Sequence, residues 1–179
     1  MIEKGWDNKQ RDLYRFRIKA LVEPVYPEKG QSIELAASLS KTELREGDPV
    51  KVFYKTNTDC HIYIFSIAAD GSVTLLVPNS LTKDNFLRSG KAYTFPPEGS
   101  PIHLKAIFLP GTKERIAEEK VKVIATRKKE ELLALSFQEG IFNVYDSHST
   151  GMISDLLKHL NKMDPSDWAE ATVVYTINR

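Results

Sequence analysis

The sequence predicts a mainly β protein, a sandwich of two antiparallel sheets with one C-terminal amphipathic helix followed by a closing strand. Three observations support this fold class. Apolar and polar residues alternate in many short runs, turn residues separate these runs, and helical spacing replaces the alternation only near the C-terminus. Alternation indicates strands because successive side chains of a strand point to opposite faces of the sheet.

The N-terminal region is expected to stand apart from the sandwich. Residues 14–19 alternate aromatic or aliphatic side chains with Arg15, Arg17 and Lys19, which predicts a strand with one cationic face. Two prolines and a glycine in the segment 23–30 then favour an extended connection. We therefore divide the chain into an N-terminal arm or edge strand with a Pro-rich connection, residues 1–30, and a β-sandwich domain, residues 31–179, which includes a helix at 151–163.

Residues 60–67 are apolar on both faces, which predicts a central strand covered on both sides. Asp70-Gly71 predicts a type I′ turn into a partner strand at 73–77. Proline at position 78 ends that strand because it has no amide hydrogen to donate. In the polar stretch that follows, Phe86 and Leu87 are expected to anchor the chain. Further strands are predicted at 33–40, 50–56, 92–95, 102–109, 121–126 and 171–177.

The expected helix is defined by one apolar stripe. Its members recur at helical spacing, and Asp155 near the start and His159 and Lys162 near the end suit the helix dipole. Asp164-Pro165 ends the helix. The segment 130–137 is ambiguous between a short helix and a covering loop. The stripe consists of Met152, Ile153, Leu156, Leu157, Leu160 and Met163.

Composition excludes several classes of protein. The 179 residues carry 25 Lys+Arg and 24 Asp+Glu, so the chain is not a globally basic nucleic-acid-binding protein. No segment has the roughly 18 apolar residues of a membrane span, and the first residues lack the apolar segment of a signal peptide. Cys60 is the single cysteine, which excludes an intramolecular disulfide and a cysteine-based zinc cluster.

Catalytic motifs are weak in this sequence. Cys60 and His61 are neighbours in a predicted strand, so their side chains point to opposite faces and do not form a dyad. Asp146 and His148 are candidates for a hydrolase or a metal site, but a turn leading into the helix, capped by Ser149 or Thr150, is the favoured interpretation. We therefore expect no enzyme activity, no catalytic residue, no metal and no cofactor.

Two groups of residues are candidates for binding. Asn79, Asp84 and Asn85 lie in a loop at one end of the predicted sandwich, where binding residues tend to occur. Their structural alternative is a strand-ending proline followed by side chains that bond to the backbone. The second group is the cationic face of Arg15, Arg17 and Lys19, whose structural alternative is a solvated strand face that opposes aggregation.

The segment from 33 to about 127 resembles the domain-of-unknown-function 4384 family of bacteria. The resemblance depends on an ordered series of motifs: Gly47-Asp48, the strand 61–65, Asp70-Gly71, Pro78-Asn79, Asp84-Asn85 and Pro110-Gly111. It implies an immunoglobulin-like β-sandwich, usually an accessory module of exported or lipid-anchored bacterial proteins. It implies no catalytic residues.

Taken together, these observations predict a non-catalytic interaction module in a bacterial protein of the cell envelope. Its partner would be another protein or a flanking domain, with no nucleic acid, and with membrane contact only through a lipid anchor or a region outside this chain. The expected location is the periplasm or envelope for the full-length protein, otherwise the cytoplasm. The alternatives are a hydrolase using Asp146 and His148, or an anion or nucleic-acid binder acting through Arg15, Arg17 and Lys19.

Overall fold

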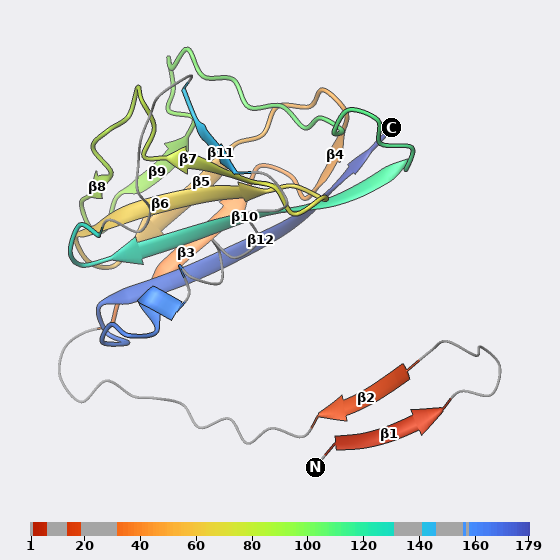
Figure 1. Cartoon of the computed structure of the whole chain (residues 1–179). Helices are drawn as coiled ribbons and strands as arrows, with labels where there is room; N and C mark the ends of the chain where they lie inside the picture. Colours follow the sequence, from red (N-terminus) through yellow and green to blue (C-terminus); the bar gives the residue numbers. More distant parts are fainter. Residues whose placement is uncertain (1, 7–13, 19–31, 131–140, 146–155, 157) are drawn as a thin grey trace.

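The computed structural model describes residues 2–6, 14–18, 32–130, 141–145, 156 and 158–179. Within these residues the protein is mainly β, as predicted, with one short helical turn (Figure 1). The strands are β1 Ile2–Trp6, β2 Tyr14–Ile18, β3 Leu35–Leu39, β4 Glu43–Arg45, β5 Val52–Thr56, β6 Cys60–Ile67, β7 Val73–Val77, β8 Phe86–Leu87, β9 Ala92–Phe95, β10 Ile116–Thr126, β11 Asn143–Tyr145 and β12 Trp168–Asn178.

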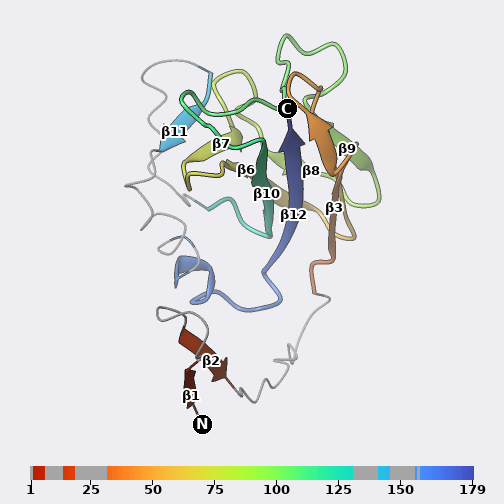
Figure 2. The same ribbon diagram turned by 90° about the vertical axis from the view of Figure 1, so that its right-hand side faces the viewer.

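The larger sheet has the strand order β11-β7-β6-β10-β12-β4, with β8 paired to the start of β6. Figure 2 shows the run from β11 to β12 across this sheet, with β3 and β9 beyond β12. All of its pairs are antiparallel except β12–β4, which is parallel. The expectation of purely antiparallel sheets is therefore wrong at this edge, where β4 runs in the same direction as β12.

The smaller sheet, β3-β5-β9, is antiparallel and packs against the larger one. Alternation in β5 places Val52 and Tyr54 in the interior and leaves Phe53 and Lys55 outside. The interior residues join one apolar cluster with residues of β6, β9, β10 and β12. The two sheets thus share a single core, as a sandwich requires.

Strand β6 confirms the prediction of a central strand that is apolar on both faces. Ile62 and Ile64 belong to the cluster between the two sheets. Tyr63 and Phe65 point to the opposite face, where they join a second buried cluster that includes Leu156 and Leu160 of the helical turn. Because both faces of β6 are covered, an alternating polar pattern is absent from its sequence.

The C-terminal helix is shorter than predicted. Leu156 and residues 158–160 are helical, while residues 151–155 and 157 lie outside the described part of the chain. The Lys162 N–H donates to the His159 carbonyl and the Met163 N–H to the Leu160 carbonyl, both one residue closer than an α-helix requires. The helix therefore ends at Leu160, before Met163, and its last turn is tight.

The turn between β6 and β7 is not the predicted type I′ turn. That turn needs positive φ at both central residues, whereas here only Gly71 has one, at 85°. The Gly71 N–H donates to the Ala68 carbonyl, and the Ala68 N–H donates to the Ser72 carbonyl. The loop has three residues, Ala69-Asp70-Gly71, and forms a type I turn closed by a glycine bulge.

The prediction of a strand at 102–109 is also wrong. This segment forms one isolated bridge, between Lys105 and Pro49. It is extended and its side chains alternate, with Ile102, Ala106 and Phe108 buried and Ile107 exposed. The alternation correctly predicted which side chains are buried. The segment, however, makes only two backbone hydrogen bonds to residues 48–50 instead of the continuous ladder of a strand.

Candidate interaction surfaces

Asn79, a predicted binding residue, is buried and bonded to its own loop. Its Nδ2 donates to the Leu76 carbonyl at 2.7 Å, and its Oδ1 accepts from the N–H groups of Leu81 and Thr82 at 2.9 and 2.7 Å. These bonds close the loop after β7. The structure thus gives Asn79 a role in holding the backbone, and its role in binding stays a prediction.

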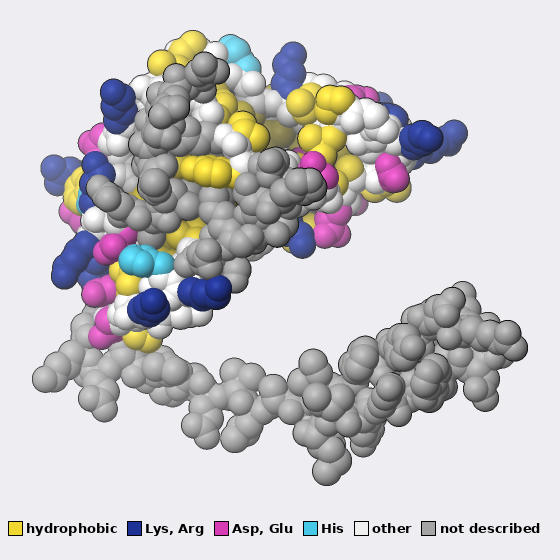
Figure 3. Space-filling model, in the orientation of Figure 1, with side chains coloured by type: hydrophobic (Ala, Val, Ile, Leu, Met, Phe, Trp, Pro, Cys, Tyr) yellow, Lys and Arg dark blue, Asp and Glu magenta, His cyan; other side chains and the backbone are white. Residues whose placement is uncertain are grey.

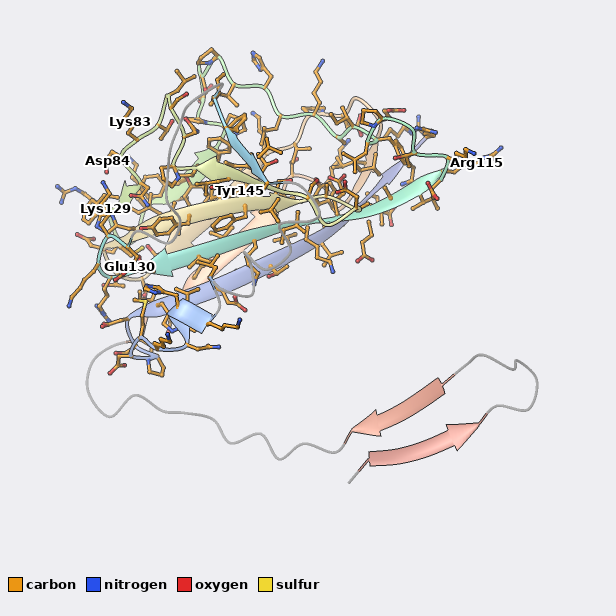
Figure 4. The ribbon with its side chains drawn as sticks, in the orientation of Figure 1. Lys83, Asp84, Arg115, Lys129, Glu130 and Tyr145 are labelled. Atoms are coloured by element: carbon orange, nitrogen blue, oxygen red, sulfur yellow. The ribbon has the colours of Figure 1, made fainter. Side chains whose placement is uncertain are left out.

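Asn85 is buried in the same way, whereas Asp84 is exposed. The Asn85 Nδ2 donates to the Ile62 carbonyl at 2.8 Å, and its Oδ1 lies 3.3 Å from His61 Nδ1. Asp84 accepts the Phe86 N–H at 3.0 Å. In the view of Figure 4, Lys83 and Asp84 lie at the same end of the molecule as Lys129 and Glu130, and Arg115 lies at the other end.

The predicted cationic strand is β2, which pairs with β1 in a separate two-stranded sheet. The register pairs Arg17 with Glu3 and Arg15 with Gly5. Lys19 lies outside the described residues.

The residues of the hydrolase alternative, Asp146 and His148, also lie outside the described part of the chain. Within the described residues, no group of three or more His, Cys, Asp or Glu side chains is placed to hold a metal ion. Cys60 is fully buried, and burial raises the pKa of its thiol. In the ranges that the structure covers, no helix is long and apolar enough to cross a membrane.

An apolar edge ends the larger sheet at β11. Among the described strands, β11 pairs only with β7. Its central residue, Val144, is 68% exposed. The Ile141 carbonyl accepts the Ser80 N–H, and both Ile141 (40% exposed) and Leu81 (56% exposed), the residue after Ser80, face solvent. We call these three residues the β11 apolar edge. Sequence reasoning missed it because β11 is only three residues long.

Three hollows lie elsewhere on the described surface. One, of about 500 Å³, is lined by Glu43–Arg45, Asn178 and Arg179, and the other two lie beside loops. The larger, of about 650 Å³, lies beside the β6–β7 turn, with Ile67 and Leu109 in its lining and Asp70, Glu114 and Glu118 among its charged residues. The smaller, of about 250 Å³, lies where the segment 49–51 meets the segments 96–100 and 102–105. Figure 3 shows charged side chains of both signs at both ends of the visible face.

A carboxylate and a phenol form a polar pair in the core, on the face of the larger sheet that meets the smaller one. The Tyr175 hydroxyl donates to Glu119 Oε2 at 2.6 Å, and both residues are buried. Burial raises the pKa of Glu119, while the hydrogen bond from Tyr175 opposes that rise. On the other face of β10, Lys122 is held at 2.6 Å by Glu170 of β12. Both pairs join β10 to β12, and they explain how Glu119 and Lys122 are accommodated at buried positions of β10.

One protein family matches this chain. The family model described as Domain of unknown function (DUF4384) matches residues 43–129, which run from β4 to just beyond β10. No curated protein and no solved structure gives a match. The match agrees with the resemblance inferred from the ordered motifs between Gly47 and Pro110. Residues 43–129, just under half of the chain, are therefore similar to the family Domain of unknown function (DUF4384).

Proposed function

We propose that this protein is a non-catalytic interaction module that binds another protein through the β11 apolar edge. The mechanism is strand addition: an extended segment of the partner pairs with β11 on the side where no described strand lies, while its side chains contact Val144, Ile141 and Leu81. Main-chain bonds supply affinity in such complexes, and side-chain contacts supply selectivity. The partner is another polypeptide or a domain that flanks this one.

The observation that supports this proposal is the contrast between the two ends of the larger sheet. Proteins normally protect an edge strand with charged residues, prolines or bulges. The β4 end follows this rule, since Glu43 and Arg45 are both exposed. The β11 end does not, because Asn143–Tyr145 contains no charge and Val144 is exposed. An unprotected apolar edge is suited to receive a strand.

The test is a peptide-display selection on the full chain. We expect enriched peptides to alternate apolar residues, as an added strand would, and to lose about tenfold in affinity for the Val144→Lys variant because a lysine stem and charge oppose edge pairing. The matched control is Val174→Lys, since Val174 is also exposed but lies in β12, inside the sheet. Equal loss for both variants, or peptides without alternation, would reject the β11 apolar edge.

The proposal also includes the absence of catalysis. Its support is that none of the three hollows found among the described residues brings a nucleophile, a base and a third polar group together. We expect the wild-type chain to hydrolyse no ester or peptide probe, and Asp146→Ala and His148→Ala to leave both this result and peptide binding unchanged. Turnover that disappears in either variant would establish the hydrolase alternative instead.

We extend the proposal to an immunoglobulin-like topology and to the bacterial cell envelope as the setting. Its support is the family resemblance together with the two sheets that share one core. Fractionation of the cells that express the full gene tests the location. Recovery with the envelope fraction is expected, and recovery only in the cytosol would contradict it.

A further inference from the structure

The smaller hollow combines an apolar lining with cations. Val50 and Ile102 line it and also belong to the core between the sheets, and Leu104 and Pro96 complete its apolar part. Two lysines and a histidine, Lys51, Lys105 and His103, line it as well, against one carboxylate, Glu98. An apolar surface beside excess positive charge is complementary to a small anion with an apolar body.

These charged residues lack the partners that others in the chain have. Lys120 pairs with Glu118, Lys122 with Glu170, Arg127 with Asp167 and Arg179 with Glu46. Among the described residues, none of the four charged or titratable residues of the hollow forms an ion pair. Their groups are therefore free to contact an incoming anion without breaking an existing ion pair.

The walls of the hollow are fixed in advance of binding. The Val50 N–H donates to the Leu104 carbonyl at 3.0 Å, which holds its two long sides together. The loop at its end is closed by the Ser100 N–H to the Pro97 carbonyl at 3.1 Å and by the Ile102 N–H to Ser100 Oγ at 3.1 Å. Gly99 permits this loop through its positive φ of 75°. A site that is already shaped binds at a lower cost in entropy.

We propose that this hollow binds a carboxylate that carries a short apolar group. The carboxylate contacts Lys51 and Lys105, and the apolar group lies against the half-buried Leu104 and the exposed Pro97. A volume of about 250 Å³ limits the bound group to a few carbon atoms, since drug-sized ligands occupy larger pockets. Two sources fit this chemistry: a free short-chain acid, or the last residue of a peptide. The site is separate from the β11 apolar edge and does not depend on it.

The test is a titration of the full chain followed by NMR, with the amide signals of Gly99, Ser100 and Ile102 as the readout. The probes are N-acetyl-leucine, which mimics a C-terminal residue, hexanoate, a free acid, N-acetyl-leucinamide, which lacks the charge, and inorganic phosphate, which lacks the apolar group. We expect these three amides to shift with at least one carboxylate and to respond far less to the amide and to phosphate. Tighter binding of N-acetyl-leucine indicates a peptide C-terminus, and tighter binding of hexanoate indicates a free acid.

Variants distinguish the hollow from general attraction to lysine. Lys51→Met and Lys105→Met keep the aliphatic stem and should each weaken carboxylate binding about threefold to tenfold. Lys55→Met is the matched control, because Lys55 is an exposed lysine four residues after Lys51 that does not line the hollow. This variant should leave carboxylate binding unchanged. The unshifted signals of each variant verify that it is folded. Equal weakening by Lys55→Met, equal binding of N-acetyl-leucinamide or phosphate, or no binding of either carboxylate would overturn the proposal.

Discussion

At the scale of single residues, the polar groups inside this protein join neighbouring strands. Glu119 of β10 and Tyr175 of β12 are direct partners in the register of the larger sheet. Their side chains share one hydrogen bond on the face that meets the smaller sheet. Lys122 and Glu170 join the same two strands on the opposite face. Burying a carboxylate is costly even when it accepts a hydrogen bond, so Glu119 lowers stability whenever it is ionised.

This cost predicts a pH dependence that is specific to Glu119. Burial raises its pKa above the ordinary 4.5, so the folded state holds the proton more tightly than the unfolded state. The free energy of unfolding should therefore fall as pH rises above about 4.5, until the folded-state pKa is passed. Glu119→Gln removes this slope while its side-chain oxygen still accepts the bond from Tyr175.

Urea unfolding at pH 4 and at pH 7.5 measures this effect. Relative to the wild type, Glu119→Gln should be more stable at pH 7.5, and the gain should shrink at pH 4. The exposed neighbour Glu118 provides the control, and Glu118→Gln should show no such change with pH. A gain for Glu119→Gln that is equal at both pH values would contradict the burial of a titrating carboxylate.

At the same scale, the predicted binding residues show that polar residues in a loop do not by themselves identify a binding site. Their position in a loop at one end of the predicted sandwich favours binding for Asn79 and Asn85, yet both side-chain amides are bonded to the backbone. A polar side chain in a loop can serve a ligand or the loop itself, and the residue type is the same in both cases. Only the partner atoms, which come from tertiary structure, separate the two roles.

At the scale of elements, period-two alternation predicted β2, β10 and β12, and a run that is apolar on both faces predicted β6. Strands β2, β6, β7 and β9 agree with their expected positions, and β10 and β12 extend beyond theirs. Of the missed strands, β4, β8 and β11 have three residues or fewer, too few for a periodic pattern. In residues 102–109 the periodic pattern is present but the strand is not. Side chains can alternate between the core and solvent without a hydrogen-bonded neighbouring strand.

The turn between β6 and β7 gives a prediction at this scale. Gly71 has a φ of 85°, and a Cβ added there would meet nothing within 4 Å. Gly71→Ala should therefore lower the free energy of unfolding by about 1–2 kcal/mol through backbone strain alone. Gly71→Asn should cost less, because asparagine tolerates the left-handed region better. Thermal unfolding of the two variants checks this, and an alanine variant as stable as the wild type would be inconsistent with the turn.

At the scale of the whole molecule, two buried clusters lie on the two faces of the larger sheet. Among the described strands, β1 and β2 pair only with each other. Proline and glycine in the connection 23–30 predicted a separate arm, although the first strand of the hairpin, β1, was missed. An isolated two-stranded hairpin is marginal in water, so its own stability is expected to be small.

Removal of residues 1–30 tests this division. The truncated chain should keep its melting temperature within about 2 °C of the full chain, because a loss of 1 kcal/mol shifts a domain of this size by about 2–4 °C. Differential scanning calorimetry of both chains provides the comparison. A larger fall would show that the arm supports the core and that the boundary lies elsewhere.

The most direct test of the interaction function is hydrogen exchange of the full chain with and without the best peptide from the display selection. Strand addition predicts that the amides of Asn143–Tyr145 become protected on binding, and that Val144→Lys removes this protection whereas Val174→Lys preserves it. Protection confined to another surface, with β11 unchanged, would contradict the proposal that the β11 apolar edge receives the partner.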